Sequence, residues 1–219
     1  MSLEEQIINQ YRKRNVKSNL YAGGYYVDHV QKEIIENIST IFNKEFNEFE
    51  NLSLLEIGAG NGTNAEIFLN LGFKIQNISF NELLTERILA IKSNYPKNNV
   101  FEGNAIEIDI DKKFDIIFQS TVFTSILNQV DREKLAEKML SLLKPNGIIL
   151  WYDFIYNNPK NKDVRKVDVK ELKILFAKSS NIYYKKITLA PPIGRQVKMF
   201  YKLFNVPFLR SHILAIIKK

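Results

Sequence analysis

Short apolar runs alternate with amphipathic stretches along most of the chain. From residue 53 onward, each apolar run is followed by a segment whose apolar residues recur every three or four positions, the spacing of a helix with one buried face. This alternation predicts an α/β fold with a parallel sheet and helices on both faces. The expected strands span residues 53–57, 74–80, 99–102, 114–119 and 147–154, and the expected helices 63–71, 82–94 and 131–143.

The two ends of the chain extend this pattern. Apolar residues at helical spacing predict two N-terminal helices, and Pro145-Asn146-Gly147 is a turn that ends a helix before the fifth strand. We treat the chain as a single domain, 1–219, with an N-terminal helical cap or lid over 1–48. The remaining expected elements are helices at 3–18, 28–44 and 168–178, and strands at Ile182–Leu189 and His212–Lys218.

The most informative segment follows the first strand. There Gly58, Gly60 and Gly62 stand at alternate positions directly before an amphipathic helix. A glycine turn between a strand and a helix lets a nucleotide-like ligand approach bare backbone at the helix N-terminus. A dinucleotide turn would carry its third glycine one place later, where this chain has Thr63. Glu56, before the turn, would repel a pyrophosphate and suits a cationic ligand such as S-adenosylmethionine.

Other strand ends supply polar groups for the same ligand, because ligands of open parallel sheets bind at the carboxyl ends of the strands. Glu82 follows the second strand, where a carboxylate can accept hydrogen bonds from both ribose hydroxyls. Asn104 follows the third, and its amide can both donate to and accept from an adenine edge. Gln119 and Ser120 end the fourth.

The composition excludes several kinds of chemistry and favours a cytoplasmic location. The 219 residues suffice for one sizeable core, and the absence of cysteine excludes disulfides, thiolate catalysis and cysteine-ligated metals. We expect no metal site. The N-terminus lacks the pattern of a signal peptide and no apolar run is long enough to span a membrane, so we expect a cytoplasmic protein. The net charge of +7 comes mostly from scattered lysines; only residues 160–219 are clearly basic.

The chain resembles the class I S-adenosylmethionine-dependent methyltransferases. The resemblance rests on Leu55–Gly62, on Phe114–Ile117 at the fourth strand and on Leu143–Gly147 before the fifth. More narrowly, residues 50–219 are similar to uncharacterised bacterial methyltransferases associated with surface-polysaccharide genes. The strings that carry this narrower likeness are Gln119–Leu127, Trp151–Phe154, Leu189–Pro192 and Leu209–His212.

The resemblance implies a Rossmann-like seven-stranded sheet whose last strand is antiparallel, with S-adenosylmethionine as methyl donor. This sequence departs from the family pattern at Glu82 and Asn104, where aspartate is usual; Ser79 is an alternative match for the first position. Tyr21 is expected to fold over the cofactor. The predicted cofactor-binding residues are Tyr21, Glu56, Gly58, Ala59, Gly60, Gly62, Glu82, Leu83, Asn104, Ala105, Gln119 and Ser120.

The acceptor site is expected at the same sheet edge. The implied topology lays residues 190–210 above the cofactor and brings Asp153 and His212 close to it. We expect Asp153 or His212 to be the acceptor's base or its hydrogen-bonding anchor; a turn-capping Asp153 and a structural His212 are the alternatives. The acceptor is expected to be a small molecule, a sugar or a lipid-linked intermediate, methylated at a hydroxyl.

The sequence also allows three other interpretations of the function. The chain could methylate a small amine, or bind the cofactor without catalysing a reaction. The basic C-terminal third, with Phe200, Tyr201, Phe204 and Phe208, could also contact membranes or nucleic acid. The irregular spacing of these aromatic residues favours a core or interface role instead, so no nucleic acid is expected.

Overall fold

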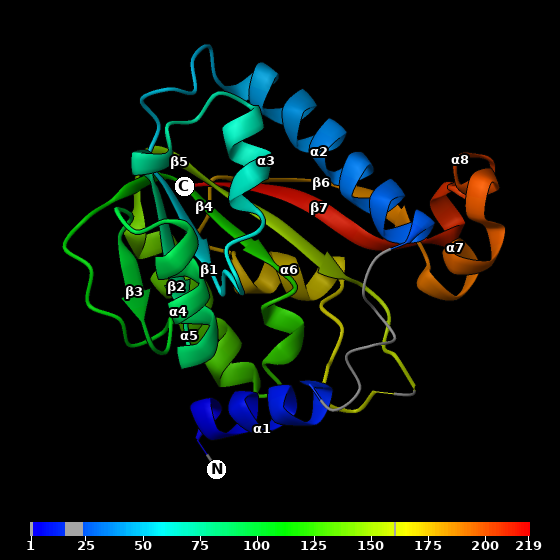
Figure 1. The fold of residues 1–219 in the computed structure, drawn as a ribbon, viewed down its shortest axis with the longest axis horizontal. Helices are drawn as coiled ribbons and strands as arrows, with labels where there is room; N and C mark the ends of the chain where they lie inside the picture. The colour runs from blue at the N-terminus through cyan, green and yellow to red at the C-terminus, as the bar shows by residue number, and fades with distance from the viewer. Residues whose placement is uncertain (1, 16–23, 160) are drawn as a thin grey trace.

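Seven strands form one sheet with helices on both faces (Figure 1). The computed structural model describes residues 2–15, 24–159 and 161–219. The strand order is β3-β2-β1-β4-β5-β7-β6. The strands are β1 (Leu54–Ile57), β2 (Ile78–Glu82), β3 (Val100–Glu102), β4 (Phe114–Ser120), β5 (Leu143–Phe154), β6 (Asn181–Leu189) and β7 (Arg210–Lys218).

Strand direction confirms the predicted fold class. Every neighbouring pair from β3 to β5 is parallel, whereas β7 runs antiparallel to both β5 and β6. The last strand therefore inserts between β5 and β6 and leaves β6 at the edge of the sheet. The carboxyl ends of the parallel strands, where ligands bind in such sheets, meet the start of β7 at one edge.

The helices cover the two faces of the sheet. Apolar residues alternate along the buried strands, so that Trp151 joins the core under α5 and α6 while the adjacent Leu150 joins the core under α2 and α3. The described helices are α1 (Leu3–Asn15), α2 (Tyr25–Glu45), α3 (Ala65–Asn70), α4 (Thr85–Asn94), α5 (Gln129–Leu142), α6 (Val169–Leu175), α7 (Pro191–Val197) and α8 (Tyr201–Phe204), with short 3-10 turns between some of them.

Two predicted boundaries near the second strand were wrong. Residues Ile75–Asn77 form a 3-10 turn, and β2 begins at Ile78. The side chain of Asn98 holds this turn by donating to the carbonyls of Ile75 and Ile78. The next helix begins at Thr85 rather than at residue 82, because Glu82 completes β2.

The predicted helix over 131–143 ends at Leu142, earlier than the Pro145–Gly147 turn that was expected to stop it. Residues 145–147 belong instead to β5, whose register with β4 shifts between Phe114 and Ile116. Asn146 takes a left-handed conformation there, with φ 64°. At the N-terminus the described part of α1 ends at Asn15, and the rest of the helix predicted over 3–18 lies outside the described residues.

The segment 190–210 leaves the end of β6 and returns as β7. It packs against the N-terminal part of α2 at the outer edge of the sheet (Figure 1). Because β7 inserts between β5 and β6, the connection begins at the outermost strand, and none of its residues lines the cleft described below. That it lies above the cofactor stays a prediction. Among the described residues, no helix combines the length and the apolar character that crossing a membrane requires.

Candidate functional site

The glycine loop after β1 adopts a conformation that favours glycine. Gly58, Gly60 and Gly62 have φ values of 62°, 59° and 77°. A Cβ atom on Gly58 would lie 2.7 Å from Cγ2 of Val122, whereas one on Gly60 would meet nothing within 4 Å. The loop thus packs closely on one side and leaves open space beside Gly60.

Glu82 links the glycine loop to the start of α4. Its carboxylate accepts hydrogen bonds from the backbone N–H of Gly60 at 2.7 Å, and from those of Leu83 and Leu84 at 2.8 and 3.0 Å. The Arg87 guanidinium lies 3.9 Å from the same carboxylate. These contacts fix a buried carboxylate at the carboxyl end of β2.

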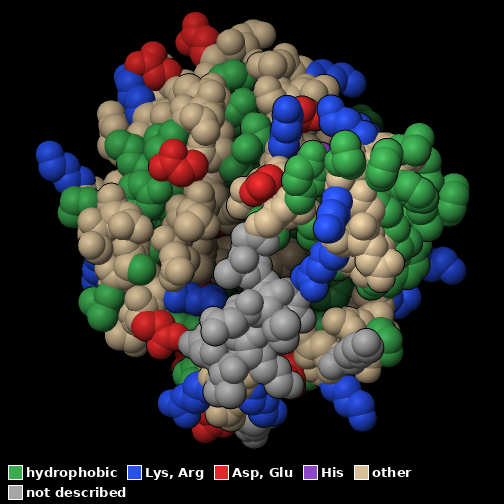
Figure 2. Space-filling view, turned by 45° about the vertical axis from the view of Figure 1, so that its right-hand side comes forward, with side chains coloured by type: hydrophobic (Ala, Val, Ile, Leu, Met, Phe, Trp, Pro, Cys, Tyr) green, Lys and Arg blue, Asp and Glu red, His purple; other side chains and the backbone are tan. Residues whose placement is uncertain are grey.

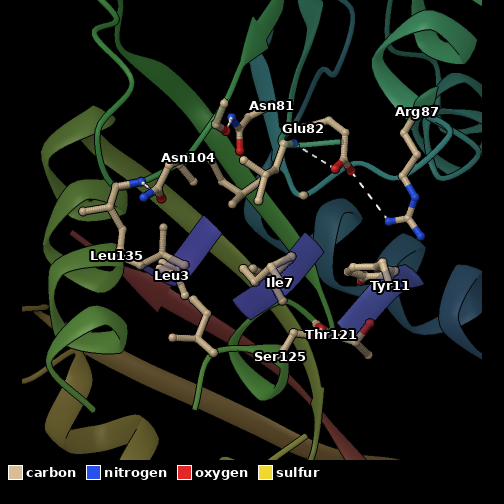
Figure 3. Close-up of a pocket in the computed structure, with 18 of the residues that line it drawn as sticks. Leu3, Ile7, Tyr11, Asn81, Glu82, Arg87, Asn104, Thr121, Ser125 and Leu135 are labelled. Atoms are coloured by element: carbon tan, nitrogen blue, oxygen red, sulfur yellow. Dashed lines mark hydrogen bonds and ion pairs between the residues drawn. The ribbon is translucent and has the colours of Figure 1, made fainter. Parts of the chain in front are cut away.

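A cleft lies at this edge of the sheet, with Glu82, Arg87 and Asn104 on one side of it (Figure 3). It holds about 620 Å³ of empty space, including a part open to solvent. Six of the predicted cofactor-binding residues line it: Gly58, Glu82, Leu83, Asn104, Ala105 and Ser120. The strand ends therefore bring together residues that are far apart in the sequence.

The first helix forms the opposite wall. A helical cap or lid was expected over 1–48, but none of the residues of this helix was named as a site residue. Leu3, Ile7 and Tyr11 of α1 line the cleft (Figure 3). The Tyr11 ring lies 4.0 Å below the Arg87 guanidinium, and Gln6 donates to the Ser125 carbonyl at 3.1 Å. The spacing of four residues between Leu3, Ile7 and Tyr11 puts them on one helix face, and this signal could have singled them out.

The turn after β4 contributes further lining residues that were not predicted, Thr121, Val122 and Ser125. Thr121 has a φ of 59°, a conformation that non-glycine residues adopt rarely and that tends to occur at functional sites. Gln119 fixes this turn from within the core, since its side chain accepts from the Val122 N–H at 3.0 Å. Gln119 itself is fully buried and does not line the cleft.

Glu56 lies behind the glycine loop. One carboxylate oxygen accepts from the Asn64 side chain at 2.7 Å, and the other is buried without a partner among the described residues. Burial raises the pKa of Glu56 to about 8, with a smaller contribution from the nearby Glu82. Neither Glu56 nor Ala59, Gly60 and Gly62 lines the cleft. Tyr21 lies outside the described residues.

These features fit S-adenosylmethionine. At the carboxyl end of β3, Gly103 has a φ of 100° and open space where a Cβ would stand, so a ligand can reach the backbone there. The Asn104 side chain caps the next turn through Oδ1, which accepts from the Ile106 N–H. The partnerless oxygen of Glu56 could accept from a cationic group, whose charge would favour the ionised carboxylate and lower its raised pKa.

Asp153 is completely buried at the end of β5. Its carboxylate accepts from the backbone N–H of Thr124 at 3.3 Å and from that of Phe154 at 3.0 Å. Burial raises its pKa to about 7, against the lowering effect of these hydrogen bonds and of Arg132. Asp153 thereby braces the turn after β4 that lines the cleft.

His212 lies in β7, paired in register with Phe154 of β5. The imidazole stacks on the Tyr152 ring, with 4.9 Å between the ring centroids, and its Nδ1 lies 2.9 Å from the Ser211 hydroxyl oxygen. Burial lowers the pKa of His212 to about 4, so the ring is neutral at physiological pH. Unlike Asp153, His212 is only partly buried.

Comparison with known proteins gives the family. A methyltransferase-domain family model matches residues 26–170. A malonyl-acyl-carrier-protein O-methyltransferase from Calditerrivibrio nitroreducens is 31% identical over 132 residues, which make up 60% of this chain and 49% of that protein. The match therefore spans about half the length of this relative.

Solved structures share the fold. An S-adenosylmethionine-dependent methyltransferase from Clostridium acetobutylicum aligns with a TM-score of 0.63 at 13% identity, over 96% of this chain and 98% of its own. The amino pentose methyltransferase CalS10 from Micromonospora echinaspora, solved with S-adenosylmethionine, aligns at 0.60 and 10% identity, over 94% and 96%. The family model, which covers more than half of the chain, shows that the chain belongs to the methyltransferase-domain family, and the solved structures show that it shares the fold of S-adenosylmethionine-dependent methyltransferases.

Proposed function

We propose that the protein transfers a methyl group from S-adenosylmethionine to a hydroxyl of a small-molecule or sugar acceptor. The observation that carries the proposal is the cleft at the carboxyl ends of β1 to β4, with the His212 imidazole two strands away on β7. The acceptor class is supported by the relative named as an O-methyltransferase and by the structural neighbour named as an amino pentose methyltransferase.

The chain's own residues would hold the donor. S-adenosylmethionine supplies an electrophilic methyl group on a sulfonium when bound. In this proposal Glu82 and Asn104 bind its adenosine moiety. The glycine loop, of which Gly58 lines the cleft, binds its methionine moiety, and Leu3 and Ile7 of the opposite wall exclude water. Rate is then gained mainly from alignment of the two reactants.

The proton of a hydroxyl acceptor needs a group to receive it. In this proposal His212 is the residue that hydrogen-bonds to the acceptor. Its imidazole is neutral, only partly buried, and oriented by Tyr152 and Ser211. Asp153 is a positioning residue in this proposal, since its carboxylate is bonded to backbone N–H groups and has no exposed surface.

The test measures methyl transfer from labelled S-adenosylmethionine to a panel of sugar and small-molecule alcohols, with matched amines beside them. We expect an alcohol to be methylated. His212→Ala should reduce kcat by at least about a hundredfold and leave the affinity for S-adenosylhomocysteine unchanged. Asp153→Asn keeps the shape of the side chain and should instead change the pH profile of turnover.

Three outcomes would count against this proposal. Methylation of the amines alone would replace it with N-methylation. Binding of S-adenosylhomocysteine without turnover of any acceptor would favour a non-catalytic partner protein. Near-normal turnover in both variants would remove His212 and Asp153 from the mechanism.

A further inference from the structure

A group of large apolar side chains stands exposed on the segment between β6 and β7. Figure 2 shows hydrophobic side chains gathered on the right-hand side of the molecule, beside Lys and Arg side chains. The largest exposed fractions are 70% for Met199, 72% for Leu203 and 78% for Phe208. We call the following residues the apolar patch: Met199, Phe200, Leu203, Phe204 and Phe208.

The polar side chains of the same segment point inward. Tyr201 is buried, and its hydroxyl donates to Glu33 of α2 at 2.8 Å and accepts from the Leu189 N–H at 3.1 Å. Asn205 donates to the other Glu33 oxygen at 2.7 Å, and Arg210 donates to Asn205. These bonds hold the segment with Met199, Leu203 and the three phenylalanines exposed. Of the core or interface role that was expected for the four aromatic residues, only Tyr201 has the core role.

The charge of the segment has one sign. Residues 190–210 contain Arg195, Lys198, Lys202 and Arg210, and no aspartate or glutamate. Arg195, Lys198 and Lys202 are exposed beside the apolar patch. A surface that presents apolar side chains among cations matches the interface of an anionic bilayer, where apolar groups enter the acyl region and cations meet the headgroups.

We propose that residues 190–210 form a docking surface for anionic lipid bilayers. A single-stranded nucleic acid fits less well, because Met199 and Leu203 offer no ring on which a base can stack. A second copy of the same surface would bring two cationic segments together without any acid between them. A bilayer satisfies both the apolar and the cationic groups.

The docking surface and the cleft both lie at the carboxyl end of the parallel strands. It follows the carboxyl end of β6, and the strand order leaves β5 and β7, with His212, between β6 and β4 of the cleft. At a strand spacing of about 4.8 Å, β6 stands roughly 14 Å from β4. An enzyme docked through this surface holds the site close to the plane of the bilayer.

The test is sedimentation of the full chain with vesicles of phosphatidylcholine, and with vesicles in which phosphatidylglycerol replaces part of it. We expect retention on the second kind only, decreasing as salt is raised. Lys198→Gln with Lys202→Gln should weaken binding roughly thirtyfold, since each cation near an anionic surface contributes about fivefold. Leu203→Ser with Phe208→Ser should also abolish retention.

Matched controls come from exposed positions elsewhere. Leu89→Ser with Ile174→Ser removes apolar side chains that are 62% and 66% exposed, and Lys97→Gln with Lys134→Gln removes two other exposed lysines. Both control pairs should bind vesicles like the unchanged protein.

Equal retention on the two vesicle types would overturn the proposal, as would patch variants that bind normally. So would preferential retention on single-stranded DNA, or a dimer that Leu203→Ser with Phe208→Ser dissociates. Unfolding by urea checks each variant's fold, and the proposal does not depend on methyl transfer.

Discussion

Two glycines of the loop after β1 share a left-handed backbone and differ in their surroundings. Placing an L-residue in that conformation costs about 1–2 kcal/mol. In Gly58→Ala this cost is joined by a 2.7 Å approach of the new Cβ to Val122, whereas in Gly60→Ala the Cβ enters open space. We expect Gly58→Ala to lower the free energy of unfolding clearly more than Gly60→Ala, as measured by urea denaturation.

The double variant Gly58→Ala with Val122→Ala serves as the control for this explanation. If the contact with Val122 causes the extra loss, shortening that side chain recovers part of it after correction for Val122→Ala alone. Equal destabilisation by the two glycine substitutions would contradict the packing argument. Gly60→Ala should still reduce binding of S-adenosylhomocysteine despite its milder effect on stability, because a backbone shift at residue 60 disturbs the N–H that binds the Glu82 carboxylate of the cleft.

The raised pKa of Glu56 makes stability depend on pH with a definite sign. Burial raises this pKa from 4.5 to about 8, so between these values the folded chain holds a proton that the unfolded chain releases. The free energy of unfolding therefore falls as pH rises through this window, by up to about 1.4 kcal/mol per pH unit. Asp153, with its pKa raised to about 7, acts in the same direction.

Glu56→Gln keeps the size of the side chain and removes its titration. We expect urea denaturation of this variant to change less between pH 5 and pH 8, at about the ends of the window, than that of the unchanged protein. Glu102→Gln, at an exposed position of β3, is the control and should retain the full pH dependence. An unchanged slope in Glu56→Gln would show that Glu56 is ionised in the folded protein.

Sequence reasoning reached six of the residues that line the cleft through local chemistry. Ligands of open parallel sheets bind at the carboxyl ends of the strands. This rule singles out the acid before the alternate glycines and the polar residues that follow successive strands. It could not assign the backbone partners of Glu82, because the contact with the Gly60 N–H joins segments that only the sheet brings together. It also could not foresee that Asp153 would be sealed beneath the turn that contains Thr124.

At the scale of elements, α1 is the part of the cleft with the least distinctive sequence. Its apolar face lies across strand ends that are distant in the chain, as the bond from Gln6 to the Ser125 carbonyl, 119 residues away, illustrates. Helical periodicity predicted the helix and its apolar face. The site that this face covers depends on tertiary packing, which periodicity does not encode.

This position predicts that α1 controls access to the cleft. Ile7→Asp places a charge among the apolar lining residues and should weaken binding of S-adenosylhomocysteine by at least about tenfold. Isothermal titration calorimetry at fixed salt measures the change. Arg12→Gln, on the exposed side of the same helix, is the control and should bind normally. Unchanged affinity in Ile7→Asp would mean that the helix leaves the cleft before the ligand enters.

The position of the connection between β6 and β7 depends on the order of the strands in the sheet, which the order of the elements along the chain does not determine. Its length and its two flanking strands were predictable from apolar runs, and the resemblance gave the reversed direction of β7. Its sideways position follows from the insertion of β7 between β5 and β6. Because Tyr201 and Asn205 bind Glu33 of α2, Tyr201 is buried while Phe200, Phe204 and Phe208 are exposed, a difference that hydrophobicity alone does not predict.

At the scale of the whole molecule, the sheet divides into two parts with different contacts. The cleft residues come from β1, β2 and β4, from the loops that follow β1 to β4, and from α1, α4 and α5. By contrast, α2, β6 and the segment 190–210 form a second connected body through Glu33. β5 and β7 join the two parts, and they carry Asp153 and His212. We therefore expect donor binding to rigidify one part and leave the other unchanged.

Hydrogen exchange with and without S-adenosylhomocysteine tests this division. Protection should increase in α1, in residues 54–64, and in the turns after β2, β3 and β4, because ligand binding suppresses local opening of the segments it contacts. Residues 181–209 should exchange at the same rate in both states. Glu82→Gln should lose the protection at the turn after β2 and at Gly60 together, because the Glu82 carboxylate accepts from the N–H groups of both Leu83 and Gly60. Glu102→Gln, on the exposed side of β3, is the control and should show the same protection as the unchanged protein. Protection that spread equally into the segment between β6 and β7 would show instead that the donor site and the docking surface respond as one unit.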